Sequence, residues 1–129
     1  MTGLHLTADL HGCSLAQAAM TDVQALRSLC LGAVSAAGLT VVGELFHRFP
    51  QIETEPQGIT GVVLLAESHV AVHTWPERCA VTLDVYVCNF KADNSARAQM
   101  LLDALLQGFA PAHVARHALH RGQPAGAVA

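Results

Sequence analysis

The sequence has very little lysine and few charged or aromatic side chains. Lys91 is the only lysine among 129 residues, aromatic residues make up 5% of the chain, and charged residues 13%. Seven lysine and arginine residues, scattered among ten acidic ones, argue against a nucleic-acid partner. An enzyme that uses pyridoxal phosphate holds it through a lysine, so that cofactor would have a single attachment point here.

Long apolar segments and export signals are also missing. The longest strongly hydrophobic stretch, residues 58–66, is far too short to cross a membrane. Residues 1–10 show no basic segment followed by an apolar one, so we expect no signal peptide, no membrane association and a cytoplasmic location. The four cysteines form no CxxC pair, and we expect their thiols to stay free in a reducing compartment.

Apolar residues are abundant, at 52% of the chain, and they follow the periods of strands and helices. The patterns predict helices over residues 22–38 and 94–109, and strands over residues 4–10, 39–49, 59–66, 68–74, 80–88 and 111–120. Residues 50–58 are expected to form an exposed loop, and residues 122–129 a frayed tail. This order predicts one α+β domain over residues 1–129, a two-layer α/β sandwich whose mostly antiparallel sheet carries both helices on one face.

The other face of this sheet is expected to carry an unusual set of side chains. Alternation along two strands places on it His69, His73, Thr82, Asp84, Tyr86 and Cys88. Such a face is too rich in functional groups for plain exposure to water. We therefore expect it to meet a second subunit.

The spacing of these groups disfavours a metal site and a hydrolytic triad. His69, His73 and Cys88 are potential metal ligands, but side chains four apart in a strand lie too far apart to chelate easily, so we expect no metal. Ser68, His69 and Asp84 could supply a triad, but the sequence around Ser68 has neither a GxSxG motif nor a strand-turn-helix pattern.

The segment Ala66-Glu67-Ser68-His69 suggests a third chemistry. A serine placed directly after a buried strand can attack the carbonyl of the preceding residue and convert the peptide to an ester. Elimination and hydrolysis then leave a new chain that begins with a pyruvoyl group. This carbonyl can form a Schiff base with a substrate amine and act as an electron sink, the role of pyridoxal phosphate elsewhere.

Several motifs resemble those of the prokaryotic S-adenosylmethionine decarboxylase proenzymes. They are ESHVAVHTWPE at residues 67–77, LDVYVC at 83–88, FHRF at 46–49 and GITG at 58–61. His5, Asp9 and Cys13 also match the family, so the resemblance extends over nearly the whole chain.

The resemblance implies a pyruvoyl-dependent decarboxylase that makes decarboxylated S-adenosylmethionine for spermidine synthesis. Cleavage between Glu67 and Ser68 would give a β chain of residues 1–67 and an α chain of residues 68–129, and Ser68 would become the pyruvoyl cofactor. His73 would assist processing, with the Thr60 hydroxyl near the scissile bond. Cys88 would return a proton to the substrate after carbon dioxide leaves, since a thiol is mostly protonated at neutral pH.

The resemblance also implies how the substrate is held. Phe49 would stack on the adenine, and Glu77 would bind the ribose hydroxyls. The family is dimeric with sites at the subunit interface, which implies a homodimer of processed chains. Strand alternation places Ser68 and His73 on opposite faces, so we expect Ser68 to lie at a kink outside the regular strand.

Departures from the family pattern leave other activities open. Arg78-Cys79-Ala80 stands where the family has an aromatic-glycine stretch, Asn89 replaces a glycine, and the loop over residues 50–58 is longer and carries Glu53 and Glu55. Such carboxylates could bind a sulfonium, but also the amine of ornithine or the guanidinium of arginine. A pyruvoyl-dependent decarboxylase of either amino acid, or a non-cleaving and non-catalytic homologue, is therefore an alternative.

Overall fold

Residues 2–123 of the computed structural model form a six-stranded antiparallel sheet with two α-helices. The strands are β1 (Gly3–His11), β2 (Val41–Arg48), β3 (Ile59–Leu65), β4 (Ser68–Trp75), β5 (Ala80–Cys88) and β6 (His113–Arg121). The α-helices are α1 (Val23–Ala36) and α2 (Ser95–Phe109), and two short 3-10 helices are η1 (Ala18–Met20) and η2 (Pro76–Arg78). The strand order is β2-β3-β4-β5-β1-β6, and every neighbouring pair is antiparallel.

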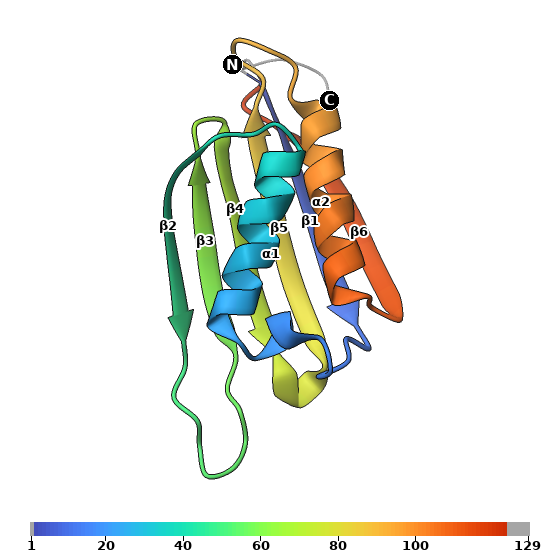
Figure 1. Cartoon of the computed structure of the whole chain (residues 1–129). Coiled ribbons are helices and arrows are strands. Elements are labelled where there is room, and N and C mark those ends of the chain that lie inside the picture. The colour runs from blue at the N-terminus through green and yellow to red at the C-terminus, as the bar shows by residue number, and fades with distance from the viewer. Residues whose placement is uncertain (1, 124–129) are drawn as a thin grey trace.

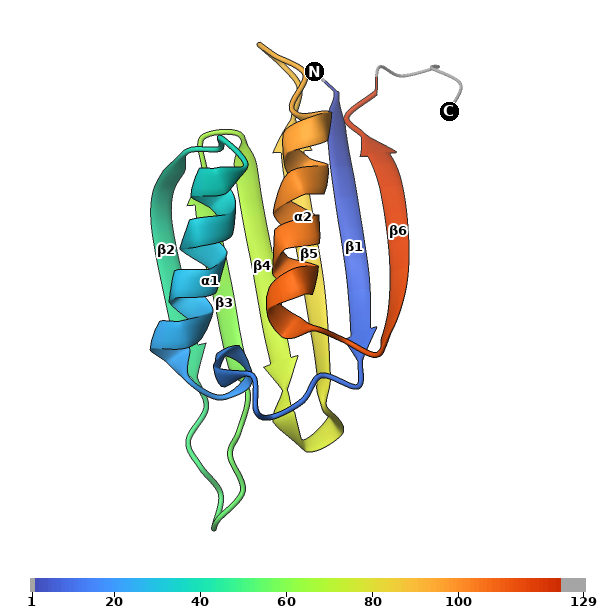
Figure 2. The same ribbon diagram turned by 45° about the vertical axis from the view of Figure 1, so that its right-hand side comes forward.

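Both helices cover the same face of the sheet, which confirms the predicted α+β sandwich (Figure 1; Figure 2). Alternation along β5 was expected to turn the odd-numbered residues toward the helices. These side chains are buried beneath the helices: Val81, Leu83, Val85 and Val87. Opposite them, α2 buries Leu101, Leu102, Leu105 and Phe109. The core is thus a layer of valine, leucine and alanine, as the shortage of aromatic residues requires.

The helix boundaries follow from local hydrogen bonds. Asp22 caps α1, since its carboxylate accepts the backbone N–H groups of Gln24 and Ala25 at 2.9 and 3.3 Å. Gly38, with φ of +76°, ends the helix as predicted. At α2 the N-cap position is Asn94, but the carboxylate of Asp93 accepts the Ser95 N–H, and this bond lowers the pKa of Asp93.

Some expected boundaries were wrong by one or two residues, and two short helices were not predicted. β2 begins at Val41, after Leu39 has been buried in the turn from α1, and β6 begins at His113. η2 begins at Pro76, whose ring fixes φ near the helical value and ends β4. Most of the predicted frayed tail, residues 124–129, lies outside the described residues. None of the helices within residues 2–123 is long and apolar enough to cross a membrane.

No helix covers the second sheet face over the described residues. This open face carries large apolar side chains as well as polar ones: Leu64 is 48% exposed and Trp75 44%. Tyr86 lies on the same face between His5 and His69, with ring centroids 5.6 and 5.8 Å away. An exposed sheet face of this composition is typical of a surface that contacts another molecule.

Candidate active site

Ser68 is the first residue of β4 and follows the tight two-residue turn formed by Ala66 and Glu67. Its φ is 148°, a conformation that favours glycine and strains other residues by roughly 1–3 kcal/mol. We expected a kink outside the regular strand. Instead, Ser68 pairs with Leu65 and Val87 inside the sheet, and the distortion is confined to its own backbone.

Three hydrogen bonds hold the turn that precedes Ser68, and one of them binds the carbonyl of the Glu67–Ser68 peptide. The Cys88 N–H donates to the Glu67 carbonyl oxygen at 2.7 Å. On the other side of the turn, the Ala66 N–H donates to the Thr40 carbonyl at 2.9 Å, and the Thr40 N–H donates to the Glu67 carboxylate at 3.0 Å. The strained residue therefore follows a carbonyl that is fixed and polarised by a backbone donor.

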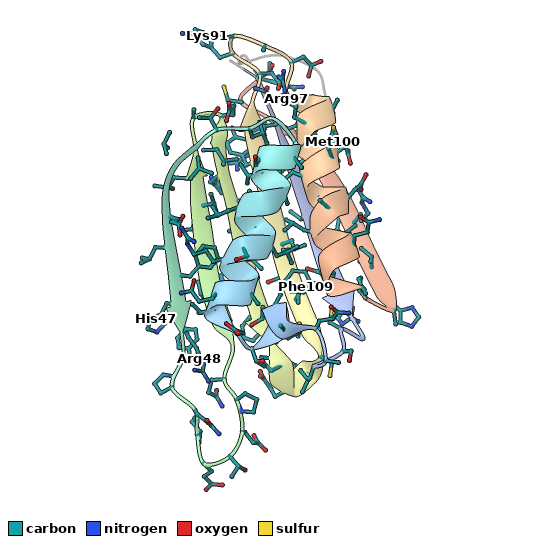
Figure 3. The ribbon with its side chains drawn as sticks, in the orientation of Figure 1. His47, Arg48, Lys91, Arg97, Met100 and Phe109 are labelled. Carbon is teal, nitrogen blue, oxygen red and sulfur yellow. The ribbon has the colours of Figure 1, made fainter. Side chains whose placement is uncertain are left out.

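A cavity of about 860 Å³ opens beside this turn. Its lining includes Glu67, Cys88 and Phe90, and it carries two cations, Lys91 and Arg97. Figure 3 shows Lys91 on the loop before α2 and Arg97 near the start of that helix. Arg97 donates to the Asn94 side chain at 2.8 Å, and Asn94 in turn donates to the Cys88 carbonyl at 2.9 Å. Both backbone groups of Cys88 are thus hydrogen-bonded.

A second cluster of candidate residues lies at the other end of the strands. Thr60 and His73 are cross-strand partners in β3 and β4, and the Thr60 hydroxyl lies 3.2 Å from His73 Nδ1. Together with Phe49 and Glu77 they line one cavity of about 220 Å³, whose remaining lining residues are Gln57, Gly58, Thr74 and Trp75. Two residues predicted for processing and two predicted for substrate binding therefore line one cavity.

One chain does not bring the two clusters together. His73 lies five residues beyond Ser68 in β4, which corresponds to about 16 Å along a strand. In Figure 1 the β3–β4 turn and the end of β5 are at the upper end of the sheet, whereas η2 and the loop after β2 are at the lower end. Ser68, Glu67 and Cys88 form one half-site, called the cleavage half-site below. Phe49, Thr60, His73 and Glu77 form the other, called the binding half-site.

The alternative chemistries considered for the open face find no support in its contacts. The Asp84 carboxylate lies 3.0 Å from Nε2 of His5, and the His69 ring packs near Tyr86. Asp84 and His69 therefore do not form a triad with Ser68. Within residues 2–123 no group of three or more His, Cys, Asp or Glu side chains could hold a metal ion.

Two of the departures from the family pattern have identifiable surroundings in the structure. Asn89 accepts the Asn94 N–H at 2.8 Å and so anchors the loop that leads into α2. Glu55, at the end of the longer loop, lines a cavity of about 350 Å³ that also contains Glu77. Sequence reasoning missed Thr40, Asn94 and Arg97, because Thr40 acts through its backbone and the other two lie in a segment with no distinctive motif.

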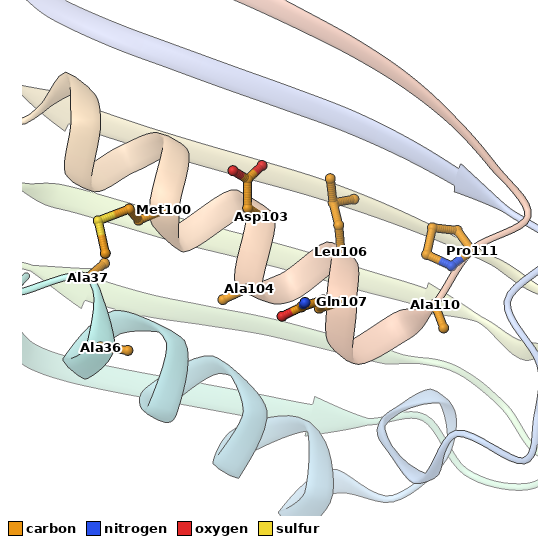
Figure 4. A pocket seen from close by; sticks show the side chains of 9 residues that line it. All are labelled: Ala36, Ala37, Met100, Asp103, Ala104, Leu106, Gln107, Ala110 and Pro111. Atoms are coloured by element: carbon orange, nitrogen blue, oxygen red, sulfur yellow. The ribbon is translucent and has the colours of Figure 1, made fainter.

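A further cavity lies on the helical side of the molecule. It has a volume of about 620 Å³ and lies between α1 and α2, as Figure 4 shows. Its lining is largely apolar and includes Ala37, Met100, Ala104 and Leu106, with Asp103 and Gln107 as polar members. It contains none of the predicted site residues.

Comparisons with known proteins agree with the geometry. The family model described as S-adenosylmethionine decarboxylase matches residues 4–122. The S-adenosylmethionine decarboxylase proenzyme of Aquifex aeolicus is 37% identical over 120 residues, which cover 93% of this chain and 81% of the relative. The proenzyme of Archaeoglobus fulgidus is 34% identical over 122 residues, covering 95% and 99%.

A solved structure is similar as well. The crystal structure of the adenosylmethionine decarboxylase from Aquifex aeolicus matches with a TM-score of 0.81 and 34% identity, over 98% of this chain and 96% of that one. Sequence and fold therefore agree along almost the full length of this chain, and the chain belongs to the S-adenosylmethionine decarboxylase family.

Proposed function

We propose that this chain is a self-processing decarboxylase of S-adenosylmethionine that cuts itself between Glu67 and Ser68. The observation that carries the proposal is the cleavage half-site, where a strained serine follows a carbonyl that the Cys88 N–H binds at 2.7 Å. The names of the relatives, S-adenosylmethionine decarboxylase proenzyme, support both the substrate and the processing.

The first step of processing is attack of the Ser68 hydroxyl oxygen on the Glu67 carbonyl carbon. Negative charge then develops on the carbonyl oxygen, and a backbone N–H already aimed at that oxygen stabilises it. Formation of the ester removes the peptide bond that holds Ser68 at φ of 148°, so the strain is released as the reaction proceeds. The Cys88 N–H and the backbone strain at Ser68 thus both favour conversion of the peptide to the ester.

The surroundings of Ser68 fit a pyruvoyl group. Ser68 is small and stands at the start of a strand, directly after Glu67, which lines the cavity together with Cys88 and two cations. A pyruvoyl carbonyl supplies an electron sink for the electrons that remain when carbon dioxide leaves. Arg97 and Lys91 add positive charge on this side of the site, where a substrate carboxylate would enter.

The binding half-site suits the nucleoside part of the substrate. Phe49 is 46% exposed at the edge of its cavity, so its ring can stack on an adenine. The Glu77 carboxylate in the same cavity can accept hydrogen bonds from two ribose hydroxyls. Thr60 and His73, which are hydrogen-bonded to each other, are placed to hold and move a proton there.

A homodimer completes the active site in this proposal. If two open sheet faces pack around a two-fold axis, the cleavage half-site of one chain meets the binding half-site of the other, and two equal sites result. The exposed Leu64 and Trp75 on this face supply apolar contact area. This arrangement also removes the conflict between Ser68 and His73, since the partner's His73 would serve Ser68.

Two measurements test the proposed function. Intact mass of the purified protein should give two fragments that divide before Ser68, whereas Ser68→Ala should give a single uncleaved chain. Release of carbon dioxide should occur with S-adenosylmethionine and not with ornithine or arginine. An unbroken native chain would contradict the processing, and release from ornithine or arginine alone would contradict the substrate.

A further inference from the structure

Cys13 and Cys79 lie side by side in the fold, although the proposed reaction uses neither. The Cys13 N–H donates to the Cys79 carbonyl oxygen at 2.8 Å. Within each residue the Cα lies about 1.5 Å from N and about 2.4 Å from O, so this bond limits the Cα–Cα distance to about 6.7 Å or less. A disulfide requires Cα atoms within about 7 Å of each other, so this pair meets the distance requirement.

The two cysteines differ in their exposure to solvent. Burial, and secondarily the charge of Cys79, raise the pKa of Cys13. Cys13 is fully buried, at 0% exposure, whereas Cys79 is partly exposed and lines the cavity that contains Glu55 and Glu77. One thiol of the pair is therefore open to a small oxidant and the other is sheltered behind it.

The backbone of Cys79 gives an independent reason to ask what this residue does. Its φ is +50°, in the left-handed region that favours glycine, and the family that the chain resembles has an aromatic-glycine stretch here. Cysteine has no intrinsic advantage in this conformation. Cysteine here therefore carries a backbone cost that glycine would not.

We propose that Cys13 and Cys79 form a reversible disulfide, a redox modification site that joins the loop after β1 to the turn after η2. With a small-molecule disulfide such as oxidised glutathione as the oxidant, the Cys79 thiolate attacks one of its sulfur atoms, the S–S bond breaks and one glutathione thiolate leaves. Cys13 then attacks the Cys79 sulfur, and its proton passes to the second glutathione, which leaves as a thiol. Two protein thiols are oxidised by two electrons, and the oxidant is reduced to two thiols.

The disulfide would have two consequences that depend on the proposed function, although its formation does not. Cys79 follows Glu77 by two residues, so the bond would fix the turn that carries the ribose-binding carboxylate. Cys13 belongs to residues 1–67 and Cys79 to residues 68–129. In a processed protein, the disulfide would therefore join the two fragments covalently.

The test is peptide mapping without reduction after incubation of the full chain with oxidised glutathione. Native protein and Ser68→Ala should both yield a peptide pair linked through Cys13 and Cys79. Cys79→Gly, which also relieves the positive φ, should lose it. Cys30→Ala should retain it, because Cys30 is a buried residue of α1 and takes no part in the pair. Glutathione that stays on Cys79 without exchange, or a Cys79 linked to another cysteine, would overturn the proposal.

A non-reducing gel separates this proposal from the proposed function. After oxidation, a processed native protein should run as one linked species and fall into two fragments on reduction, while Cys79→Gly should run as two fragments in both lanes. A linked peptide pair in a chain that is never cut would overturn the self-processing but leave the disulfide intact. Cut fragments that stay separate after oxidation would overturn only the disulfide.

Discussion

At Cys88 the backbone and the side chain serve different parts of the proposed reaction. Its N–H binds the Glu67 carbonyl, and the residue lines the cavity beside the turn. Replacement by alanine keeps the N–H, so Cys88→Ala should still be cut before Ser68. Because the proton donor is gone, turnover should fall by about 100-fold or more. Intact mass and carbon dioxide release measure the two effects separately. Normal turnover in this variant would remove Cys88 from the mechanism.

The Thr60–His73 contact makes a second prediction at the scale of single residues. Thr60→Val preserves the side-chain shape but removes the hydroxyl that lies 3.2 Å from His73 Nδ1. A hydrogen bond of this kind contributes about 0.5–1.5 kcal/mol, so we expect the rate of processing to fall by about 3- to 10-fold. The time course of cleavage after synthesis measures this rate. Thr60→Ser is the matched control and should process at nearly the native rate; equal slowing in both variants would contradict a role for the hydroxyl.

At the scale of the elements, Gly58 allows the chain that enters β3 to lie close against the backbone of Thr74 in β4. A Cβ at this position would lie 2.0 Å from the Thr74 carbonyl oxygen, which is backbone and cannot swing away. Gly58→Ala should therefore lower the free energy of unfolding by about 2 kcal/mol or more. Gly32 in α1 is the matched control, since a Cβ there meets nothing within 4 Å. Gly32→Ala should raise the free energy of unfolding by about 0.5–1 kcal/mol. Urea unfolding of both variants checks the contrast.

Most elements could be predicted because each has a local signal. Strand β5 alternates strictly between buried and partly exposed residues, and α1 begins at a capping aspartate and ends at a glycine with positive φ. The two 3-10 helices had no such signal, because three residues are too short for any periodicity to show. The elements that could be predicted are those long enough for a hydrophobic period to repeat.

The sequence predicts candidate site residues but not their arrangement in space. Phe49, Thr60, His73 and Glu77 do share a cavity, but strand alternation gives only the face of a residue and not its distance along the sheet. The scissile carbonyl is bound by the backbone N–H of Cys88, and the turn before Ser68 is held by the backbone of Thr40; any residue except proline could supply these backbone groups. Residue types therefore could not reveal them.

At the scale of the whole molecule, the separation of the half-sites predicts that two inactive variants can restore activity in a mixed dimer. Neither Ser68→Ala nor His73→Ala should be active alone. When the two variants are expressed together, a mixed dimer would contain one site with an intact Ser68 from one chain and an intact His73 from the other. We expect up to half of the sites in that dimer to regain activity, and cleavage should occur only in the His73→Ala chain, as intact mass can show.

The matched control for this experiment carries both substitutions on one chain. Coexpressed with Ser68→Ala, the double variant supplies no intact Ser68 and should give neither cleavage nor carbon dioxide release. Restored activity there would mean contamination by native protein. Absence of restoration in the original mixture, with mixed dimers detected by mass, would show that each chain builds its site alone.

The order of strands also bears on what happens after the cut. Residues 1–67 contribute β1, β2 and β3, and residues 68–129 contribute β4, β5 and β6. Strand β1 lies between β5 and β6. It belongs to the first piece but is hydrogen-bonded on both sides to strands of the second piece. Severing the chain therefore gives two new termini without giving two separable molecules, and native chromatography should return both pieces in one peak.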